Sequence, residues 1–169
     1  MSFKYSWKNK EANFGLPTET EVSGGTHISC ENILIFDNQF AALRRPEAIP
    51  QHEIPKKAID SDRPHLYFVH GLPIWGETMD VYISRVVHEQ AGVGVKSFRV
   101  VDLQMEIYED TNQWALTPLI FVEIDKLPVA GNYGNEITEV VQFGKDNVPD
   151  DFGWWEKEEL EEFFIKHPI

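Results

Sequence analysis

Apolar and polar residues alternate along the chain in a way that predicts several strands. A β-branched, apolar run at 27–37 leads into Asp37-Asn38, which marks a turn, and 39–45 is predicted to be the returning strand of a β-hairpin. Further strands are predicted where apolar runs recur, at 65–71, 98–108, 115–125 and 135–143. Pro118 predicts an edge or a bulge in its strand, because proline cannot donate to the hydrogen-bond ladder.

Two other segments have the apolar spacing of an amphipathic helix. From Thr78 to Ala91, apolar residues recur at intervals of three and four, at Met79, Tyr82, Ile83, Val86 and Val87. Thr78 suits an N-cap, and Gly92 suits the position after the last turn. A second helix is predicted at 156–167, with inward-facing Leu160, Phe163 and Phe164. This order of elements predicts an α+β fold with helices packed on a mixed sheet.

The remaining segments lack such a pattern. Residues 1–25 are polar and turn-rich, so we predict an N-terminal extension followed by one domain at 26–169. Residues 46–64 include four prolines, a density at which no regular element persists, and they predict an exposed loop. The length of 169 residues suits a single domain with a real core.

Charge and cysteine content narrow the function classes. A net charge of -13 disfavours nucleic-acid binding, because an acidic surface repels phosphate backbones. The single cysteine, Cys30, is predicted to be a buried thiol on a strand, and a chain with one cysteine fits a reducing compartment. No signal peptide and no apolar run of membrane-spanning length are found. These features predict a cytoplasmic protein with no nucleic-acid partner and no membrane partner.

The most informative stretch runs from Gly71 to Val93 and reads GLPIWGETMDVYISRVVHEQAGV. It resembles the Nudix box, whose pattern is Gly, five residues, Glu, seven residues, then Arg-Glu-U-X-Glu-Glu-X-Gly-U, where U is a bulky aliphatic residue. Seven positions match this pattern in register, namely Gly71, Glu77, Arg85, Val87, Glu89, Gly92 and Val93. The resemblance extends in style over about 26–165, because the predicted opening hairpin and closing helix are similar to those of the family.

The resemblance implies a Nudix fold, with a mixed β-sheet sandwiched by helices. It also implies a pyrophosphohydrolase that cleaves a nucleoside diphosphate linked to another group, with magnesium or manganese as cofactor. In the family, three helical glutamates hold the metal, and here those positions are Val86, Glu89 and Gln90. Valine cannot ligate, and a glutamine amide brings no negative charge to a cation that prefers carboxylate oxygens. The metal site is therefore depleted.

The resemblance also assigns roles to single residues. It implies a catalytic set of Glu89, Arg85 and Glu77, in which Arg85 is the orienting group. The implied metal ligands are Glu89, Gln90 and His70, the last through its carbonyl or as a soft side-chain ligand. A plain alternative for Arg85 and Glu89 is an exposed helix pair worth about 0.3–0.5 kcal/mol.

Substrate contacts are expected from three residues around the box. Gly71 begins the box turn, Trp75 lies in its loop where an aromatic ring can stack on a ligand, and Arg44 lies in the second strand of the predicted hairpin. Acidic residues downstream of the box are candidates to compensate for the lost ligands, and they are Glu106, Glu123, Glu136 and Glu139.

Two functions remain open on the sequence. The first is a weak, metal-dependent Nudix hydrolase of a small-molecule nucleoside diphosphate derivative. The second is a catalytically inactive binding or regulatory module on the same scaffold, which the residues Val86 and Gln90 favour. The sequence also permits a homodimer, and it does not identify the substrate.

Overall fold

The computed structural model describes residues 26–45, 64–74, 76–108, 113–131 and 137–169. The predicted extension at 1–25, nearly all of the predicted loop at 46–64, and Trp75 lie outside the described residues.

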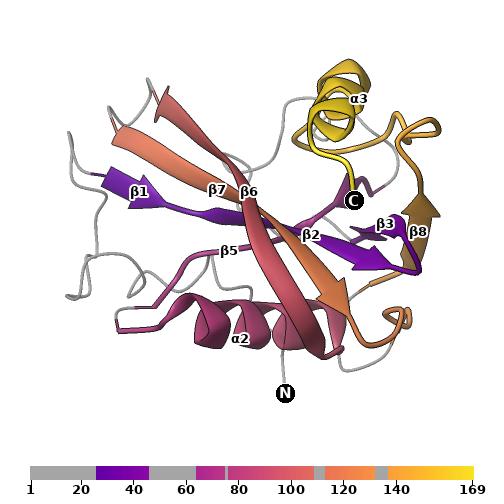
Figure 1. Cartoon of the computed structure of the whole chain (residues 1–169), viewed down its shortest axis with the longest axis horizontal. Coiled ribbons are helices and arrows are strands. Elements are labelled where there is room, and N and C mark those ends of the chain that lie inside the picture. The colour runs from indigo at the N-terminus through magenta and orange to yellow at the C-terminus, as the bar shows by residue number, and fades with distance from the viewer. Residues whose placement is uncertain (1–25, 46–63, 75, 109–112, 132–136) are drawn as a thin grey trace.

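An eight-stranded mixed sheet forms the centre of the described chain. Its strands are β1 (Thr26–Ile28), β2 (Cys30–Phe36), β3 (Gln39–Arg44), β4 (Leu66–Tyr67), β5 (Val69–Gly71), β6 (Val95–Tyr108), β7 (Gln113–Ile124) and β8 (Glu139–Phe143). Strand β7 pairs in parallel with β1 and β2, and the other pairings are antiparallel. Helix α2 (Met79–Ala91) lies on one face and helix α3 (Lys157–Lys166) on the other (Figure 1). The predicted α+β fold, a mixed sheet between helices, is confirmed.

The predicted hairpin is formed by β2 and β3, with Phe36 opposite Gln39. Asp37 and Asn38 adopt φ values of 51° and 58°. Both values lie in the left-handed region that a two-residue hairpin turn needs to match the twist of its strands. Short polar side chains tolerate this region better than most, which is why these two residues suit the turn.

The predicted strand at 65–71 is split into two short strands by a change of partner. Strand β4 pairs with β3, whereas β5 pairs with β2. Phe68, between them, packs in the aromatic core under α3, and Val69 packs in the aliphatic core under α2. The second half thereby reaches β2, where Gly71 lies opposite Cys30 at the start of the turn into α2.

The two long predicted strands pair as the antiparallel strands β6 and β7, but the prediction for Pro118 is wrong. Strand β7 is internal, because it lies between β6 on one side and β1 and β2 on the other. Pro118 pairs regularly with Leu103, and the nearby irregularity lies between Val100 and Asp102 of β6. On its other side, Pro118 falls between the last partner of β1, Leu116, and the first partner of β2, Leu119, where an N–H is least needed.

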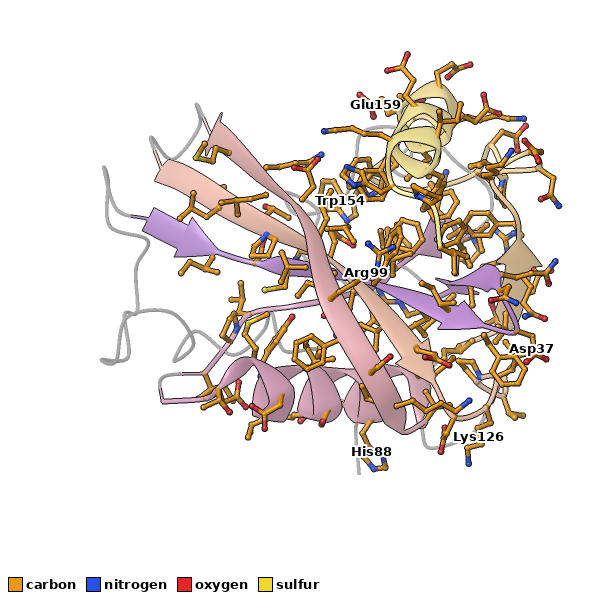
Figure 2. The ribbon with its side chains drawn as sticks, viewed as in Figure 1. Asp37, His88, Arg99, Lys126, Trp154 and Glu159 are labelled. Atoms are coloured by element: carbon orange, nitrogen blue, oxygen red, sulfur yellow. The ribbon has the colours of Figure 1, made fainter. Side chains whose placement is uncertain are left out.

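Helix α2 forms where the apolar spacing predicts it. Thr78 takes an extended N-cap conformation, and Gly92 ends the helix with φ 68°, a left-handed value that favours glycine. The side chains of Tyr82, Ile83, Val86 and Val87 are all buried against β2, β5 and β7. Met79, also in the predicted stripe, is partly exposed at the first turn. On the outer side of the helix, exposed His88 points away from the sheet (Figure 2).

Helix α3 covers the opposite face over an aromatic core. Glu156 and Glu159 form a reciprocal capping box that begins the helix. Its inward residues are those the spacing predicts, Leu160, Phe163 and Phe164. The Phe164 ring stacks on Phe40 with centroids 3.9 Å apart. No helix among the described residues is long and apolar enough to cross a membrane.

Candidate active site with a depleted metal-binding box

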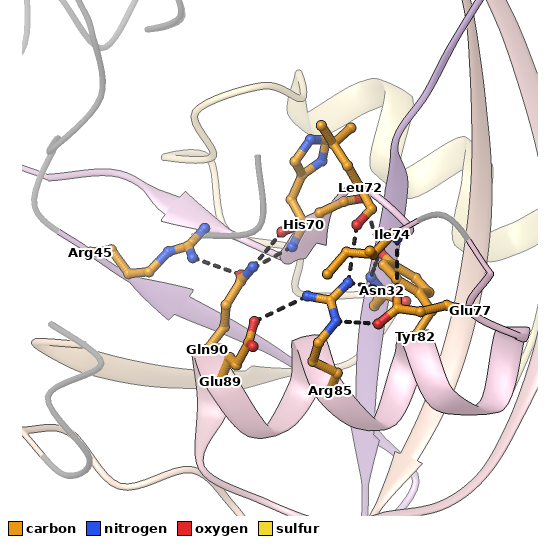
Figure 3. Close-up of polar contacts among 11 residues, drawn as sticks. Asn32, Arg45, His70, Leu72, Ile74, Glu77, Tyr82, Arg85, Glu89 and Gln90 are labelled. Carbon is orange, nitrogen blue, oxygen red and sulfur yellow. Dashed lines mark hydrogen bonds and ion pairs between the residues drawn. The ribbon is translucent and has the colours of Figure 1, made fainter. Parts of the chain in front are cut away.

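A strand, a turn and a helix bring the predicted site residues together. Strand β5 ends at Gly71, and α2 begins at Met79 after a turn. The side of α2 that carries Arg85 lies next to this turn (Figure 3). Helical residues spaced three and four apart share one face, so Arg85 and Glu89 both face the turn. The juxtaposition expected from the sequence, a helix that presents residues 85–90 beside this turn, is present.

Arg85 joins the helix to the turn through a two-pronged ion pair with Glu77. Arg85 Nε donates to Glu77 Oε1 at 2.5 Å, and Nη2 donates to Oε2 at 2.8 Å. Nη2 also donates to the Leu72 carbonyl at 3.1 Å. Because a guanidinium matches a carboxylate in this fork geometry, the pair fixes both groups in position.

Glu77 is held as an anion inside this arrangement. Its Oε2 also accepts a hydrogen bond from the Ile74 amide at 2.8 Å, which closes the turn. Burial acts to raise the pKa of Glu77, but the hydrogen bonds from Arg85 and Ile74 outweigh it, and the pKa is lowered. Burial likewise acts to lower the pKa of Arg85, and the bonds to Glu77 and the charges of Glu77 and Glu89 raise it instead.

Glu89 is the accessible carboxylate of the box helix. Arg85 Nη1 donates to Glu89 Oε2 at 3.2 Å, so the guanidinium connects Glu77 with Glu89. The Glu89 side chain is 38 % exposed, compared with 11 % for Glu77. Of these two carboxylates, Glu89 is therefore the one that is more accessible to solvent.

Gln90 is fully buried, and both ends of its carboxamide are engaged. Its Oε1 accepts hydrogen bonds from Arg45 Nη1 at 2.9 Å and from the His70 amide at 3.2 Å. Its Nε2 donates to the His70 carbonyl. The two predicted metal donors, the Gln90 oxygen and the His70 carbonyl, therefore belong to one internal network that also includes Arg45 (Figure 3).

Val86, at the first of the three helical positions that hold glutamates in the Nudix pattern, lies in the apolar core. Its side chain is 0 % exposed, in the same cluster as Tyr82, Ile83 and Val69. Its burial agrees with its place in the apolar stripe of the helix. Position 86 supplies no ligand atom, and its surroundings in this cluster are apolar.

The buried hydroxyl of Tyr82 is hydrogen-bonded to Gly71, the first residue of the box. Tyr82 Oη donates to the Gly71 carbonyl at 2.9 Å. Asn32 Nδ2 donates to Tyr82 Oη at 3.1 Å and to the Val69 carbonyl at 2.9 Å. Burial raises the pKa of Tyr82 well above its ordinary value, so the hydroxyl stays a donor. Sequence reasoning missed Asn32, although a polar residue inside the apolar run CENILIF was a usable signal.

The predicted substrate contacts have different outcomes. Gly71 lies at the box turn, where its carbonyl accepts from Tyr82. Arg44 lies away from the box, because its guanidinium bonds Glu139 at 2.6 Å and Asp151 at 2.7 Å. The next residue, Arg45, reaches Gln90 instead. Successive residues of extended chain point to opposite faces, so adjacent Arg44 and Arg45 reach different surroundings.

His70 contributes its side chain to another pair. The His70 Nδ1 atom lies 2.7 Å from Glu31 Oε1, and the Glu31 side chain is buried. The backbone of His70 bonds Gln90 while its ring pairs with a carboxylate of β2. Both groups of His70 that were predicted as ligands, the carbonyl and the imidazole ring, therefore bond other residues of the chain.

The donor atoms do not fit a divalent cation in this arrangement. Magnesium and manganese sites usually gather several free oxygen donors. Here one exposed carboxylate remains, and no group of three or more His, Cys, Asp and Glu residues suited to a metal occurs in the described part of the chain. Of the compensating acids, Glu123 bonds Ser97 and Glu139 bonds Arg44. The side chains of Glu106 and Glu136 lie outside the described residues.

Cys30 is buried on β2, as predicted, and its thiol is expected to be inert. Burial is the main cause that raises its pKa to about 12. At pH 8 about 10⁻⁴ of such a thiol is ionised, and the thiolate is the nucleophile. We expect a disulfide reagent to react with the native protein at least about 100-fold more slowly than with the urea-unfolded chain. Equal rates in a stopped-flow absorbance assay would contradict the buried placement.

With the geometry described, the chain can be compared with known proteins. No protein-family model matches it, and no curated protein matches its sequence. Solved structures do match. A MutT Nudix hydrolase from Burkholderia pseudomallei is similar with a TM-score of 0.59 and 13 % identity, over 80 % of this chain and 96 % of that one. The ORF135 protein of E. coli is similar with a TM-score of 0.61 and 15 % identity, over 85 % and 91 %.

A UDP-X diphosphatase is also similar, with a TM-score of 0.55 and 13 % identity, over 89 % of this chain and 66 % of that one. At these identities the likeness establishes the fold. The chain has the fold of the Nudix hydrolases, as the residues of its box imply.

Proposed function

We propose that this chain is a Nudix-fold module that binds a small-molecule nucleoside diphosphate derivative without a divalent cation and with little or no turnover. The state of the three ligand positions carries the proposal. Val86 is core, the Gln90 carboxamide is bound to Arg45 and His70, and Glu89 alone keeps an accessible carboxylate. The ligand class is suggested by fold neighbours that include a UDP-X diphosphatase and an ADP compounds hydrolase.

The retained parts of the box suit binding. Arg85, Glu77 and the Ile74 amide bond one another across the turn and hold it in a fixed shape. A preformed site loses little conformational entropy when a ligand enters. On this proposal the module uses the preformed box turn for binding but lacks the carboxylate charge that metal catalysis demands.

Calorimetry with a chelator tests the proposal directly. Titration with UDP-glucose and ADP-ribose should give the same affinity, within twofold, in excess EDTA and in millimolar magnesium. Phosphate or nucleoside monophosphate release from either compound, with magnesium or manganese, should stay at the rate of the buffer. Binding that is lost in EDTA, or no binding of any diphosphate derivative, would overturn the proposal.

A second candidate is the weak hydrolase, and one observation favours it. The Arg85 guanidinium joins Glu77 to Glu89, so the orienting group and one carboxylate of the implied catalytic set remain together. This candidate requires turnover that depends on magnesium or manganese and is lost in Glu89→Gln. Glu158→Gln is the matched control, because Glu158 is an exposed carboxylate on α3, which covers the other face of the sheet from α2.

The cellular setting follows from the sequence and stays a prediction. We expect a cytoplasmic protein with no nucleic-acid partner. Light scattering after gel filtration tests the predicted homodimer, since the chain mass is 19.5 kDa and a dimer has twice that mass.

A further inference from the structure

We propose that the guanidinium of Arg45 takes the place of the divalent cation in this box. Arg45 Nη1 lies 2.9 Å from Gln90 Oε1, the oxygen at one of the three positions that the resemblance assigns to metal ligands. The inference goes beyond ligand binding, because it concerns how the box is held together whether or not a nucleotide binds.

The hydrogen bonds of Gln90 occupy the oxygen that a metal ion would use. An amide oxygen has two lone pairs, and here they accept from Arg45 Nη1 and from the His70 amide. The Nε2 group donates to the His70 carbonyl. A metal that used the Gln90 oxygen would first have to displace one of its two donors.

The chemistry of the pair explains why glutamine stands at position 90. An amide can accept from a guanidinium and donate to a carbonyl at the same time, whereas a carboxylate can only accept. A glutamate here would pair with Arg45 but would face the His70 carbonyl without a proton to share. The combination of Arg45 with Gln90 thus satisfies the His70 backbone on both its N–H and its C=O.

Arg45 is positioned as a fixed, internal cation. Its side chain is buried, its Nη2 lies 3.5 Å from the Phe68 carbonyl, and its guanidinium lies over the Tyr67 ring at 5.4 Å. A guanidinium is a covalent part of the chain, so a chelator does not remove it as it would remove a bound metal ion. The Arg45 guanidinium would also repel a metal ion bound beside it. A site with this arginine therefore has no use for the carboxylates that are missing at positions 86 and 90.

Manganese binding to variants of the free protein tests this inference without any nucleotide. The free Mn²⁺ signal in electron paramagnetic resonance is followed for the wild type, Gln90→Glu, Gln90→Glu with Arg45→Gln, and Gln90→Glu with Arg44→Gln. We expect at least a tenfold rise in Mn²⁺ affinity only in the variant that lacks Arg45. Addition of Glu89→Gln to that variant should abolish the gain. Arg44 is the matched control, because it is the adjacent arginine and bonds Glu139 and Asp151 instead.

Two outcomes would overturn the inference. One is equal Mn²⁺ affinity of Gln90→Glu with and without Arg45, and the other is a double variant that binds no tighter than the wild type. If circular dichroism shows the double variant unfolded, the single variant Arg45→Gln decides. It releases the Gln90 oxygen and should bind Mn²⁺ severalfold more tightly than Arg44→Gln, whereas equal binding refutes the replacement. Because no nucleotide is used, failure here leaves the calorimetric test of the proposed function intact.

Discussion

Val86→Glu is expected to lower the free energy of unfolding by about 3–5 kcal/mol at pH 7, although it restores a residue of the Nudix pattern. The Val86 side chain is fully buried in an apolar cluster with Tyr82, Ile83 and Val69. A carboxylate placed there loses its hydration and gains no partner, so its charged form is strongly disfavoured. The loss of stability therefore distinguishes a position 86 that lies in the apolar core from one that faces an open ligand site.

Urea unfolding at pH 7 and pH 5 measures this effect, with Val81→Glu as the control. Val81 lies on the same helix but is 51 % exposed, so its replacement should change stability by less than about 0.5 kcal/mol. Burial raises the native pKa of the introduced carboxyl, so the cost should shrink as pH falls and the folded form takes up a proton. Equal stabilities for the two variants would mean that position 86 reaches solvent, and magnesium should then be tested as a stabiliser.

Local patterns in the sequence were sufficient for the elements that depend on near neighbours. The α2 stripe of Tyr82, Ile83, Val86 and Val87 follows helical spacing, and all four are buried. The turn residues Asp37 and Asn38 tolerate the positive φ values that their hairpin requires. In both cases the chemistry of a few adjacent residues determines the backbone, so a single sequence contains the information.

Elements that depend on distant partners could not be predicted in the same way. The segment at 65–71 has one apolar run, but its halves pair with different strands, a choice made by the rest of the sheet. Arg44 and Arg45 are adjacent and chemically identical, and the register of β3 against β8 places Arg44 beside Glu139. The bond between Arg45 and Gln90 could therefore not be predicted from the sequence, since the two residues are 45 positions apart.

The second large effect is expected from Glu77→Gln, which should cost about 2 kcal/mol of unfolding free energy at pH 7. Glu77 receives two hydrogen bonds from Arg85 and one from the Ile74 amide, and its side chain is only 11 % exposed. Glutamine keeps the size of the side chain but presents an amide N–H₂ to one of these donors. The half-buried guanidinium of Arg85 then loses the negative charge of its main partner, which destabilises the folded state.

The cost should depend on pH in a direction set by the lowered pKa of Glu77. A carboxyl with a lower pKa in the folded state stabilises the protein above its unfolded pKa, about 4.3 for glutamate, and this stability is lost as pH falls through the native pKa. The difference between wild type and Glu77→Gln should therefore be constant from pH 7 to about pH 5, and it should shrink below about pH 4. Urea unfolding monitored by tryptophan fluorescence at pH 7, 5 and 3 measures this difference.

Glu139→Gln is the control, because Glu139 also bonds an arginine but its side chain is 53 % exposed. Exposed ion pairs contribute about 0–1 kcal/mol, so this variant should lose less than half as much stability as Glu77→Gln at pH 7. Similar losses in the two variants would show that the pair with Arg85 is no stronger than a surface contact. The box turn would then have to be held mainly by the Gln90 and Tyr82 hydrogen bonds to its backbone, and Tyr82→Phe should produce the larger loss.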